Sequence, residues 1–205
     1  MNDTVRSYDR DAATYVASTA VMPDSIRTRI EDLAARSGPA GRVLEVGSGG
    51  GRDALAMERL GLVVRRTDIT PGFVELLRER GHACDLVDPL VDDLSSPDGP
   101  YDAVWANASL LHVARQHLPT VLSRLAAVVR DGGLLRISLK EGDGDGWSTH
   151  GSIRSPRHFT YWRADDLRTV VEGAGWTDVS ISTGVAGQRG ETWLEVSAVC
   201  GSVTR

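Results

Sequence analysis

The sequence predicts an α/β domain whose mainly parallel sheet is covered by helices on both faces. Three observations support this fold class. Short apolar runs alternate with amphipathic segments, the first run ends in a cluster of glycines, and the last two runs follow each other with no helix between them. Alternation of strand and helix favours a parallel sheet, and two consecutive strands favour an antiparallel hairpin that closes the sheet.

The individual elements follow from periodicity and from turn residues. Short runs, several of them rich in β-branched residues, predict strands; they are residues 42–46, 63–67, 82–85, 102–106, 134–139, 179–183 and 193–199. Apolar residues at helical spacing predict helices; they are residues 23–37, 53–60, 71–80, 119–129 and 164–174. Glycines after the first helix end it, Pro71 suits a first helical turn, and Asp131-Gly132-Gly133 is expected to end the fourth helix.

Composition restricts the class of protein. A chain of 205 residues suits one domain, and a formal net charge of −5 offers no electrostatic footprint for nucleic acid or an anionic membrane. We expect Cys84 and Cys200 to be small buried side chains rather than a disulfide or a metal site. There is no signal-peptide pattern, and no apolar run approaches the roughly 20 residues that span a bilayer. We therefore expect a cytoplasmic monomer or homodimer.

A glycine-rich segment, Gly47-Ser48-Gly49-Gly50-Gly51, directly follows the first predicted strand. Glycines let the chain turn sharply and let a ligand approach the backbone, and the next helix starts with unpaired N–H groups that can bind an anion. The dinucleotide fingerprint G-x-G-x-x-G is incomplete, because Arg52 stands at its third glycine. A nicotinamide-dependent reductase, for which no Tyr-x-x-x-Lys pair is evident either, and a glycine loop without a ligand remain as alternatives.

Residues 43–52, Val-Leu-Glu-Val-Gly-Ser-Gly-Gly-Gly-Arg, resemble the first motif of class I S-adenosylmethionine-dependent methyltransferases. Further motifs follow in that family's order: Asp68, Cys84-Asp85-Leu86, residues 101–106 and residues 130–135, in which Asp131 replaces the usual proline. The resemblance covers about residues 40 to 140. It implies a Rossmann-like, seven-stranded sheet in a single domain of residues 1–205, with lid helices in 1–38 and an acceptor-site insert in 141–162.

The resemblance also implies S-adenosylmethionine as the cofactor. The glycine turn would hold the methionyl carboxylate, Glu45 the ammonium, Asp68 the ribose, and Asp85 with Leu86 the adenine. The full cofactor-binding set is Glu45, Gly47, Ser48, Gly49, Gly51, Arg52, Asp68, Ile69, Asp85, Leu86 and Ala106. Three alternatives stay open, because Asp68 could cap the next helix, Asp85 could be a solvated turn residue and Arg52 could pair with a surface acid.

The acceptor end is less strongly marked. Methyl transfer demands positioning above all, and a base only if the nucleophile must lose a proton early. The catalytic candidates are His112, which has a suitable pKa for a base, and Tyr15, although both could serve packing alone. The predicted acceptor-binding set is Tyr8, Asn107, Leu111, His112, Lys140, Arg157, Phe159 and Tyr161. We expect no metal, because no set of side chains has metal-ligand spacing.

The expected activity is methyl transfer to an oxygen or nitrogen of a small-molecule acceptor, of the kind found in specialised metabolism. The segment after the fourth strand lacks the Asp/Asn-Pro-Pro-Tyr/Phe motif, and the chain has no Pro-Cys nucleophile. These absences argue against the exocyclic-amine methylases of DNA and of protein glutamine, and against methylation of cytosine C5. A nicotinamide-dependent oxidoreductase and a non-catalytic cofactor-binding protein are the alternative functions.

Overall fold

The structure is a computed structural model that describes residues 3–186 and 190–201. A seven-stranded sheet forms its centre, in the order β3-β2-β1-β4-β5-β9-β8. The strands are β1 (Arg42–Val46), β2 (Val63–Asp68), β3 (Asp85–Leu86), β4 (Tyr101–Asn107), β5 (Val129–Lys140), β8 (Trp176–Ala186) and β9 (Glu191–Cys200). The first five are parallel, and β9 is antiparallel to both β5 and β8. The predicted fold class is therefore confirmed.

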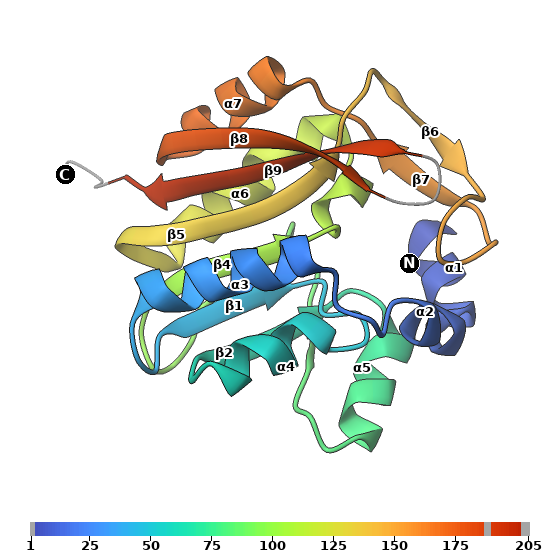
Figure 1. Cartoon of the computed structure of the whole chain (residues 1–205), viewed down its shortest axis with the longest axis horizontal. Helices are drawn as coiled ribbons and strands as arrows, with labels where there is room; N and C mark the ends of the chain where they lie inside the picture. The colour runs from blue at the N-terminus through green and yellow to red at the C-terminus, as the bar shows by residue number, and fades with distance from the viewer. Residues whose placement is uncertain (1–2, 187–189, 202–205) are drawn as a thin grey trace.

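Helices cover both faces of this sheet (Figure 1). They are α1 (Asp3–Arg10), α2 (Ala12–Ser18), α3 (Asp24–Ser37), α4 (Arg52–Arg59), α5 (Pro71–Glu79), α6 (Leu118–Ala127) and α7 (Ala164–Gly173), with the short turns η1 (Leu110–His112) and η2 (Arg115–His117). Helices α3 and α4 lie on one face, α6 and α7 on the other, and α1 and α2 lie beyond the end where the parallel strands finish. Met1 and Asn2, part of the predicted lid segment, lie outside the described residues.

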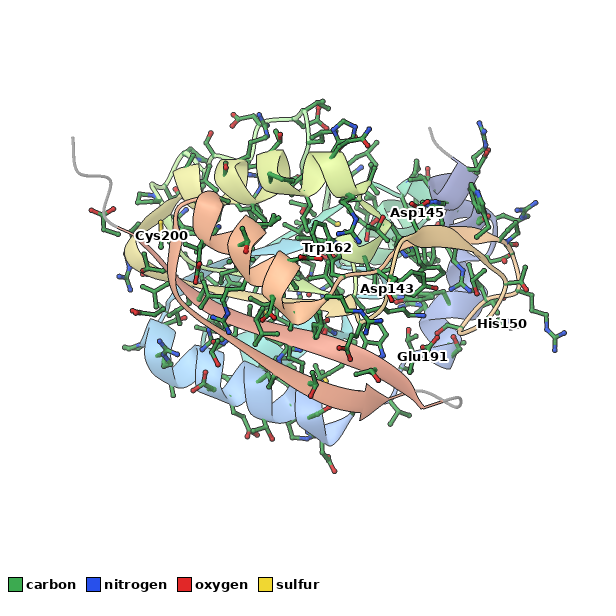
Figure 2. The ribbon with its side chains drawn as sticks, turned by 90° about the horizontal axis from the view of Figure 1, so that it is seen from above. Asp143, Asp145, His150, Trp162, Glu191 and Cys200 are labelled. Carbon is green, nitrogen blue, oxygen red and sulfur yellow. The ribbon has the colours of Figure 1, made fainter. Side chains whose placement is uncertain are left out.

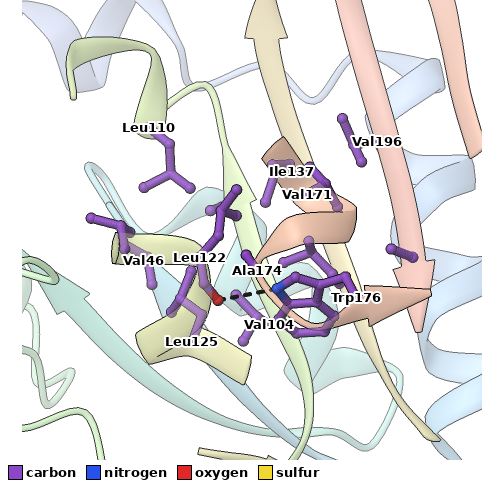
Figure 3. Close-up of a cluster of buried hydrophobic side chains, with 14 of the residues drawn as sticks. Val46, Val104, Leu110, Leu122, Leu125, Ile137, Val171, Ala174, Trp176 and Val196 are labelled. Carbon is purple, nitrogen blue, oxygen red and sulfur yellow. Dashed lines mark hydrogen bonds between the residues drawn. The ribbon is translucent and has the colours of Figure 1, made fainter. Parts of the chain in front are cut away.

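Alternating side chains of the central strands supply two cores. Val43 and Trp105 face α3 and α4, whereas Leu44 and Val104 face α6 and α7, as the two-residue period of a strand requires. The larger core includes Trp176, which is 1% exposed and donates its indole N–H to the Leu122 carbonyl at 3.1 Å (Figure 3). A buried indole with a partner for its N–H is the favourable arrangement for tryptophan.

Three segments differ from the sequence expectation. The third strand is Asp85–Leu86 rather than 82–85, because Gly81 and His82 close α5 through bonds to the Arg78 and Leu77 carbonyls. The helix α6 ends at Ala127, and β5 already begins at Val129, before the glycines that were expected to end the helix. The ends of elements are set by such closing bonds, which periodicity does not reveal.

The long polar segment 141–156 is partly ordered as a hairpin. Strand β6 (Asp145–Ser148) pairs antiparallel with β7 (Arg157–Thr160) in a second, two-stranded sheet. Asp143, Asp145 and His150 lie toward the same end of the molecule, and Cys200 lies at the opposite end (Figure 2). The hairpin packs against α1 and η1, so it belongs to the end of the sheet where ligands bind in this class of fold.

The order of the strands defines where a ligand would bind. Strands β2 and β3 extend from one side of β1, and β4 and β5 continue on the other, so the strand order reverses between β1 and β4. Open α/β sheets bind ligands beyond the carboxyl ends of the strands at this reversal. None of the described helices is long and apolar enough to cross a membrane.

Candidate active site

A cavity of about 290 Å³ lies at the strand-order reversal. Its volume is near the lower limit of the roughly 300–1,000 Å³ that is typical of ligand pockets. The residues predicted from the sequence that line it are Tyr8, Tyr15, Gly47, Gly49, Asp68, Ile69 and His112. Segments that follow several of the parallel strands thus meet residues of the N-terminal helices at one site.

The glycine turn forms one side of the cavity and is held by its own backbone. Gly47 and Gly49 have φ angles of 81° and 52°. The N–H groups of Gly47 and Ser48 donate to the Thr67 carbonyl at 2.9 and 3.0 Å. A Cβ at Gly47 would lie 2.4 Å from the Cβ of Ser109, in the segment after β4. The turn therefore requires glycine at this position, both for the positive φ and for the close approach.

Asp68 joins the glycine turn to the start of α5. Its side chain is buried; Oδ2 accepts from the Gly49 N–H at 2.9 Å and Oδ1 from the Thr70 N–H at 2.8 Å. Burial raises the pKa of Asp68, although these bonds act to lower it. Thr70 is the N-cap residue of α5, so the bond from its N–H is in line with the alternative that Asp68 helps to cap this helix. A carboxylate offers about four acceptor positions, so Asp68 retains capacity for hydroxyl donors in the cavity.

Glu45 and Ser48 lie behind the turn and do not line the cavity. Ser48 Oγ donates to Glu45 Oε2 at 2.5 Å, and both side chains are buried. Burial, together with the charge of Asp53, raises the pKa of Glu45 to about 8. Gly51 does not line the cavity either; a Cβ at this position would lie 2.6 Å from Leu77 Cδ2, so Gly51 packs against α5. These three residues support the turn from the protein side.

Arg52 ties the turn to the N-terminal segment. Its Nε donates to Asp53 Oδ1 at 2.8 Å, and its Nη1 donates to the carbonyls of Thr19 and Val21 at 3.0 and 3.3 Å. The alternative interpretation was that Arg52 pairs with a surface acid. The guanidinium does pair with an acid, but Asp53 is buried. Arg52 does not line the cavity, so its contribution is to fix the entry to α3.

The residues after β3 differ from the expected adenine contacts. Leu86 is 54% exposed, and Asp85 accepts from Arg65 Nε at 2.8 Å, so neither lines the cavity. Val87 and Asp88 do. Asp88 Oδ1 accepts from the Leu90 amide at 2.9 Å. Asp85 does not line the cavity because β3 begins at this residue, so the strand ends later than predicted and Val87 and Asp88 follow it instead.

The Tyr8 hydroxyl and the His112 imidazole form a hydrogen-bonded pair at the cavity. Tyr8 Oη lies 2.9 Å from His112 Nε2, and His112 Nδ1 lies 2.6 Å from the His158 carbonyl oxygen. Because a carbonyl only accepts, Nδ1 carries the proton and Nε2 accepts from Tyr8. Burial lowers the pKa of His112 to about 4, with Arg157 and Lys140 adding to the effect. The imidazole is therefore neutral at physiological pH.

Aromatic rings enclose this end of the cavity. The centre of the Tyr15 ring lies 5.3 Å from the ring centres of both Tyr8 and Phe73, and burial raises the pKa of Tyr15. Phe73 was not predicted; the signal for it in the sequence is its place in the first turn of α5, five residues after Asp68. Rings around a poorly hydrated space suit a cationic group such as a sulfonium.

Of the predicted residues in and after β4, His112 lines the cavity, but Ala106, Asn107 and Leu111 do not. Ala106 and Leu111 are buried in the core. Asn107 Oδ1 accepts from Ser138 Oγ at 2.8 Å, and its Nδ2 donates to Asp53 Oδ2 at 3.1 Å. Asn107 thus orders the strand ends. The neighbours Ala108, Ser109 and Leu110 line the cavity instead, and periodicity could not select among residues of an irregular segment.

Four predicted acceptor residues form a layer behind the Tyr8–His112 pair. Phe159 packs on His112 with ring centres 4.8 Å apart, and Tyr161 stacks on Phe159 at 6.4 Å. Lys140 Nζ lies 4.3 Å from the centre of the Phe159 ring. Arg157 lies 5.4 Å from the same centre. None of the four lines the cavity. Phe159 and Arg157 contact a lining residue directly, whereas Tyr161 and Lys140 contact Phe159.

Helix α1 is held over the cavity by hydrogen bonds from residues along its length to two other elements. Ser7 Oγ donates to the Pro156 carbonyl at 2.6 Å, and the His158 N–H donates to Thr4 Oγ1 at 2.9 Å. The Gly72 N–H donates to Asp9 Oδ1 at 2.7 Å. The predicted N-terminal lid thus joins the β6–β7 hairpin to α5. Among the described residues, no group of three or more His, Cys, Asp or Glu side chains is arranged to hold a metal ion.

Residues 19–181 match the model of a protein family described as a methyltransferase domain. The match covers most of the chain, and it includes the glycine turn, Asp68 and the strands that build the cavity. The protein belongs to this methyltransferase family. The resemblance noted in the sequence is therefore confirmed.

Curated relatives are similar over part of their length. The ubiquinone biosynthesis O-methyltransferase of Xanthomonas axonopodis pv. citri is 38% identical over 117 residues, which are 54% of this chain and 48% of that protein. The 27-O-demethylrifamycin SV methyltransferase of Amycolatopsis mediterranei is 30% identical over 138 residues, 63% of this chain and 48% of that protein. The chain spans about half the length of these relatives.

Solved structures share the fold at low identity. The 1,6-didemethyltoxoflavin-N1-methyltransferase of Burkholderia thailandensis, solved with its acceptor and S-adenosylhomocysteine, has a TM-score of 0.73 and 22% identity, covering 98% of this chain and 86% of that one. The CcbJ methyltransferase of Streptomyces caelestis has a TM-score of 0.77 and 16% identity, covering 98% and 100%. At this level the likeness concerns the fold.

Proposed function

We propose that the protein transfers a methyl group from S-adenosylmethionine to an oxygen or nitrogen of a small-molecule acceptor. The observation that carries this proposal is the cavity at the strand-order reversal, where the glycine turn, the buried carboxylate of Asp68 and an aromatic enclosure meet. Family membership and relatives that methylate oxygen or nitrogen of small molecules, according to their names, support it.

The residues at the cavity fit the parts of this cofactor. Gly49 would present backbone toward the methionyl group, Asp68 would accept from the ribose hydroxyls, and Asp88 rather than Asp85 would face the adenine amino group. Tyr8 and Tyr15 would lie beside the sulfonium. Bound S-adenosylmethionine supplies an electrophilic methyl group on a positively charged sulfur.

The chain's own contribution is positioning and exclusion of water. The aromatic rings keep the reacting end of the cavity apolar, which suits a sulfonium and favours near-attack geometry. His112 holds the Tyr8 hydroxyl through Nε2, and its own Nδ1–H is fixed on the His158 carbonyl. A neutral imidazole with a pKa of about 4 is a weak base, so we propose that His112 positions Tyr8 rather than removing a proton.

Turnover with an acceptor panel tests the proposal. Purified protein is incubated with methyl-labelled S-adenosylmethionine and with phenols, carboxylic acids, amines and heteroaromatic compounds, and S-adenosylhomocysteine and labelled product are measured. We expect both products in equal amounts with at least one acceptor class. Binding of S-adenosylhomocysteine without labelled product from any class would instead favour a non-catalytic cofactor-binding protein.

A further inference from the structure

Arg157 carries a buried charge that no carboxylate neutralises. Its side chain is 3% exposed. Nε donates to the Ser155 carbonyl at 3.3 Å, and Nη2 donates to the carbonyls of His150 and Ile153, the latter at 3.0 Å. Within residues 3–186 and 190–201, no carboxylate lies at ion-pair distance from it. Carbonyl oxygens solvate a guanidinium, but they leave its net charge in place.

Glu191, Asp143 and Asp145, which lie toward this end of the molecule (Figure 2), each have a side-chain partner other than Arg157. Glu191 Oε1 accepts from Lys140 Nζ at 2.8 Å. Asp145 Oδ2 lies 2.8 Å from His158 Nε2, and Asp143 pairs with an exposed arginine on the far side of the hairpin. None of these acids, and no other carboxylate of the described residues, lies within ion-pair distance of Arg157. An anionic ligand in the neighbouring cavity would therefore be attracted to its charge.

Arg157 and Lys140 both lie beside the Phe159 ring, behind the Tyr8–His112 pair. The Arg157 guanidinium carbon lies 5.4 Å from the centre of the Phe159 ring, and Lys140 Nζ lies 4.3 Å from the same centre. Phe159 in turn packs on His112. Arg157 also lies 5.7 Å from the centre of the Tyr8 ring. Arg157 thus contacts the pair that lines the cavity directly, and Lys140 is separated from it by the Phe159 ring.

The charged side chains behind the Tyr8–His112 pair come from three strands. Strand β7 contributes Arg157, β5 contributes Lys140, and β9 contributes Glu191. Two further acids lie on other elements: Asp68 lines the cavity and its charge acts on Tyr8, and Asp9 of α1 accepts from the Gly72 N–H. Behind the pair, two buried cations therefore stand beside one acid, Glu191, in surroundings where charges act strongly.

We propose that the acceptor is an acidic hydroxyl compound, namely a phenol, an enol or a carboxylic acid, and that Arg157 and Lys140 favour its binding as an oxyanion. This inference rests on the proposed methyl transfer and adds the chemical class of the attacking atom. A nearby cation stabilises the charged form of an acid, whereas an ammonium acceptor would meet like charge from both side chains.

The proposed step is a displacement by oxygen. The acceptor releases its proton to solvent on binding. A lone pair of the resulting oxyanion then forms the O–C bond to the methyl carbon while the C–S bond breaks, and the electrons of that bond remain on sulfur. Charge is balanced, because an anion and a sulfonium give a neutral ether or ester and a neutral thioether. No protein base acts in this step, in agreement with a neutral His112 whose Nε2 is occupied by Tyr8.

A spectroscopic titration tests the charge preference without turnover. The probe is 4-nitrophenol, whose phenolate absorbs at longer wavelength, bound to the protein that is saturated with S-adenosylhomocysteine. We expect the apparent pKa of the bound probe to fall by about one unit or more relative to the free probe. Lys140→Met should raise this value and Glu191→Gln should lower it further, because the two substitutions remove opposite charges of one pair.

Arg157 needs a control for folding, because it also holds the 150–155 loop. Arg157→Met should raise the apparent pKa of the bound probe, and Arg157→Lys, which retains the charge, should restore most of the shift. Equal effects of Arg157→Met and Arg157→Lys, or shifts of the same sign for Lys140→Met and Glu191→Gln, would show that packing rather than charge is responsible and would overturn the inference.

Ring-matched acceptors separate this inference from the proposed function. A set of phenols and benzoic acids is compared with the corresponding anilines at equal concentration. We expect at least a tenfold larger kcat/KM for the acidic members. Faster methylation of the anilines, or binding of S-adenosylhomocysteine without binding or methylation of any acidic member, would overturn the inference. Failure to bind S-adenosylhomocysteine would instead remove the proposed methyl transfer itself.

Discussion

Asp68 is the residue on which the cofactor proposal depends most. It lies at the end of β2, lines the cavity, and links the glycine turn to α5 through two backbone amides. We expect Asp68→Ala to weaken binding of S-adenosylhomocysteine by about 1–3 kcal/mol, the scale of a lost hydrogen bond to a charged group. Calorimetry measures this change. Unchanged affinity in a variant with native thermal stability would exclude the ribose contact.

Glu45 gives a pH-dependent prediction. Burial raises its pKa from 4.5 to about 8. The folded protein thus keeps a proton that the unfolded chain releases between these values, so Glu45 makes stability fall as pH rises through this window. We expect Glu45→Gln to match the wild type near about pH 4 and to exceed it by roughly 4 kcal/mol near about pH 8, because each pKa unit corresponds to about 1.4 kcal/mol. Urea unfolding at several pH values measures the difference; a constant difference would contradict the assignment.

Tyr8 and His112 are predicted to act as a unit. We expect Tyr8→Phe and His112→Ala each to lower turnover more than cofactor affinity, and the double variant to be little worse than either single one, because both remove the same hydrogen bond. Since the pKa of His112 is lowered to about 4, turnover should show no inflection from this group between about pH 5 and 8. Additive losses, or an inflection that His112→Ala abolishes, would restore His112 as the base.

Sequence patterns predicted residues well where a regular strand ends and poorly beyond it. Gly47, Gly49 and Asp68 follow regular strands, and each lines the cavity as expected. Asp85 does not line the cavity, because β3 begins at the residue where the predicted strand was to finish. Asp88, which follows the strand, lines the cavity instead. The roles that the sequence assigned to these residues toward parts of the cofactor remain predictions. Hydrogen bonds between residues far apart in the chain decide which side chains face the cavity, and sequence patterns do not reveal such bonds.

At the scale of elements, the strand–helix alternation was predictable because each strand has its own apolar period. The segment 141–156 was not, since β6 is polar and gains its order by pairing with β7 and by packing on α1. Such long-range contacts leave little local pattern. Periodicity also could not predict that α1 contacts the hairpin through Ser7 and Thr4. The family resemblance, however, predicted a lid in this part of the chain.

The two elements β8 and β6 carry tryptophans with contrasting environments. Trp176 is 1% exposed in the core of Figure 3, whereas Trp147 is 56% exposed. We expect Trp176→Ala to lower the free energy of unfolding by about 3–5 kcal/mol, because it leaves a large cavity and removes the bond to Leu122. The matched control Trp147→Ala should change it by about 0.5 kcal/mol or less. Denaturant unfolding that gave similar losses for both would contradict the assignment of this core.

For the whole molecule, the strand order brings distant segments to one cavity. Residues from α1, the glycine turn, the end of β2 and the segment after β4 line the same space because parallel strands all finish at one edge. The fold class and family follow from the sequence, whereas the shape of the acceptor end depends on how the N-terminal helices and the β6–β7 hairpin meet. The substrate proposal accordingly rests on charges that only the assembled structure brings together.

The most direct test of the central claim is a calorimetric titration of the purified protein with S-adenosylhomocysteine, with NADH titrated in parallel. If the glycine turn and Asp68 form a site for a sulfonium nucleoside, S-adenosylhomocysteine binds with one-to-one stoichiometry and NADH gives no saturable heat. Saturable binding of NADH, with none of S-adenosylhomocysteine, would contradict the account.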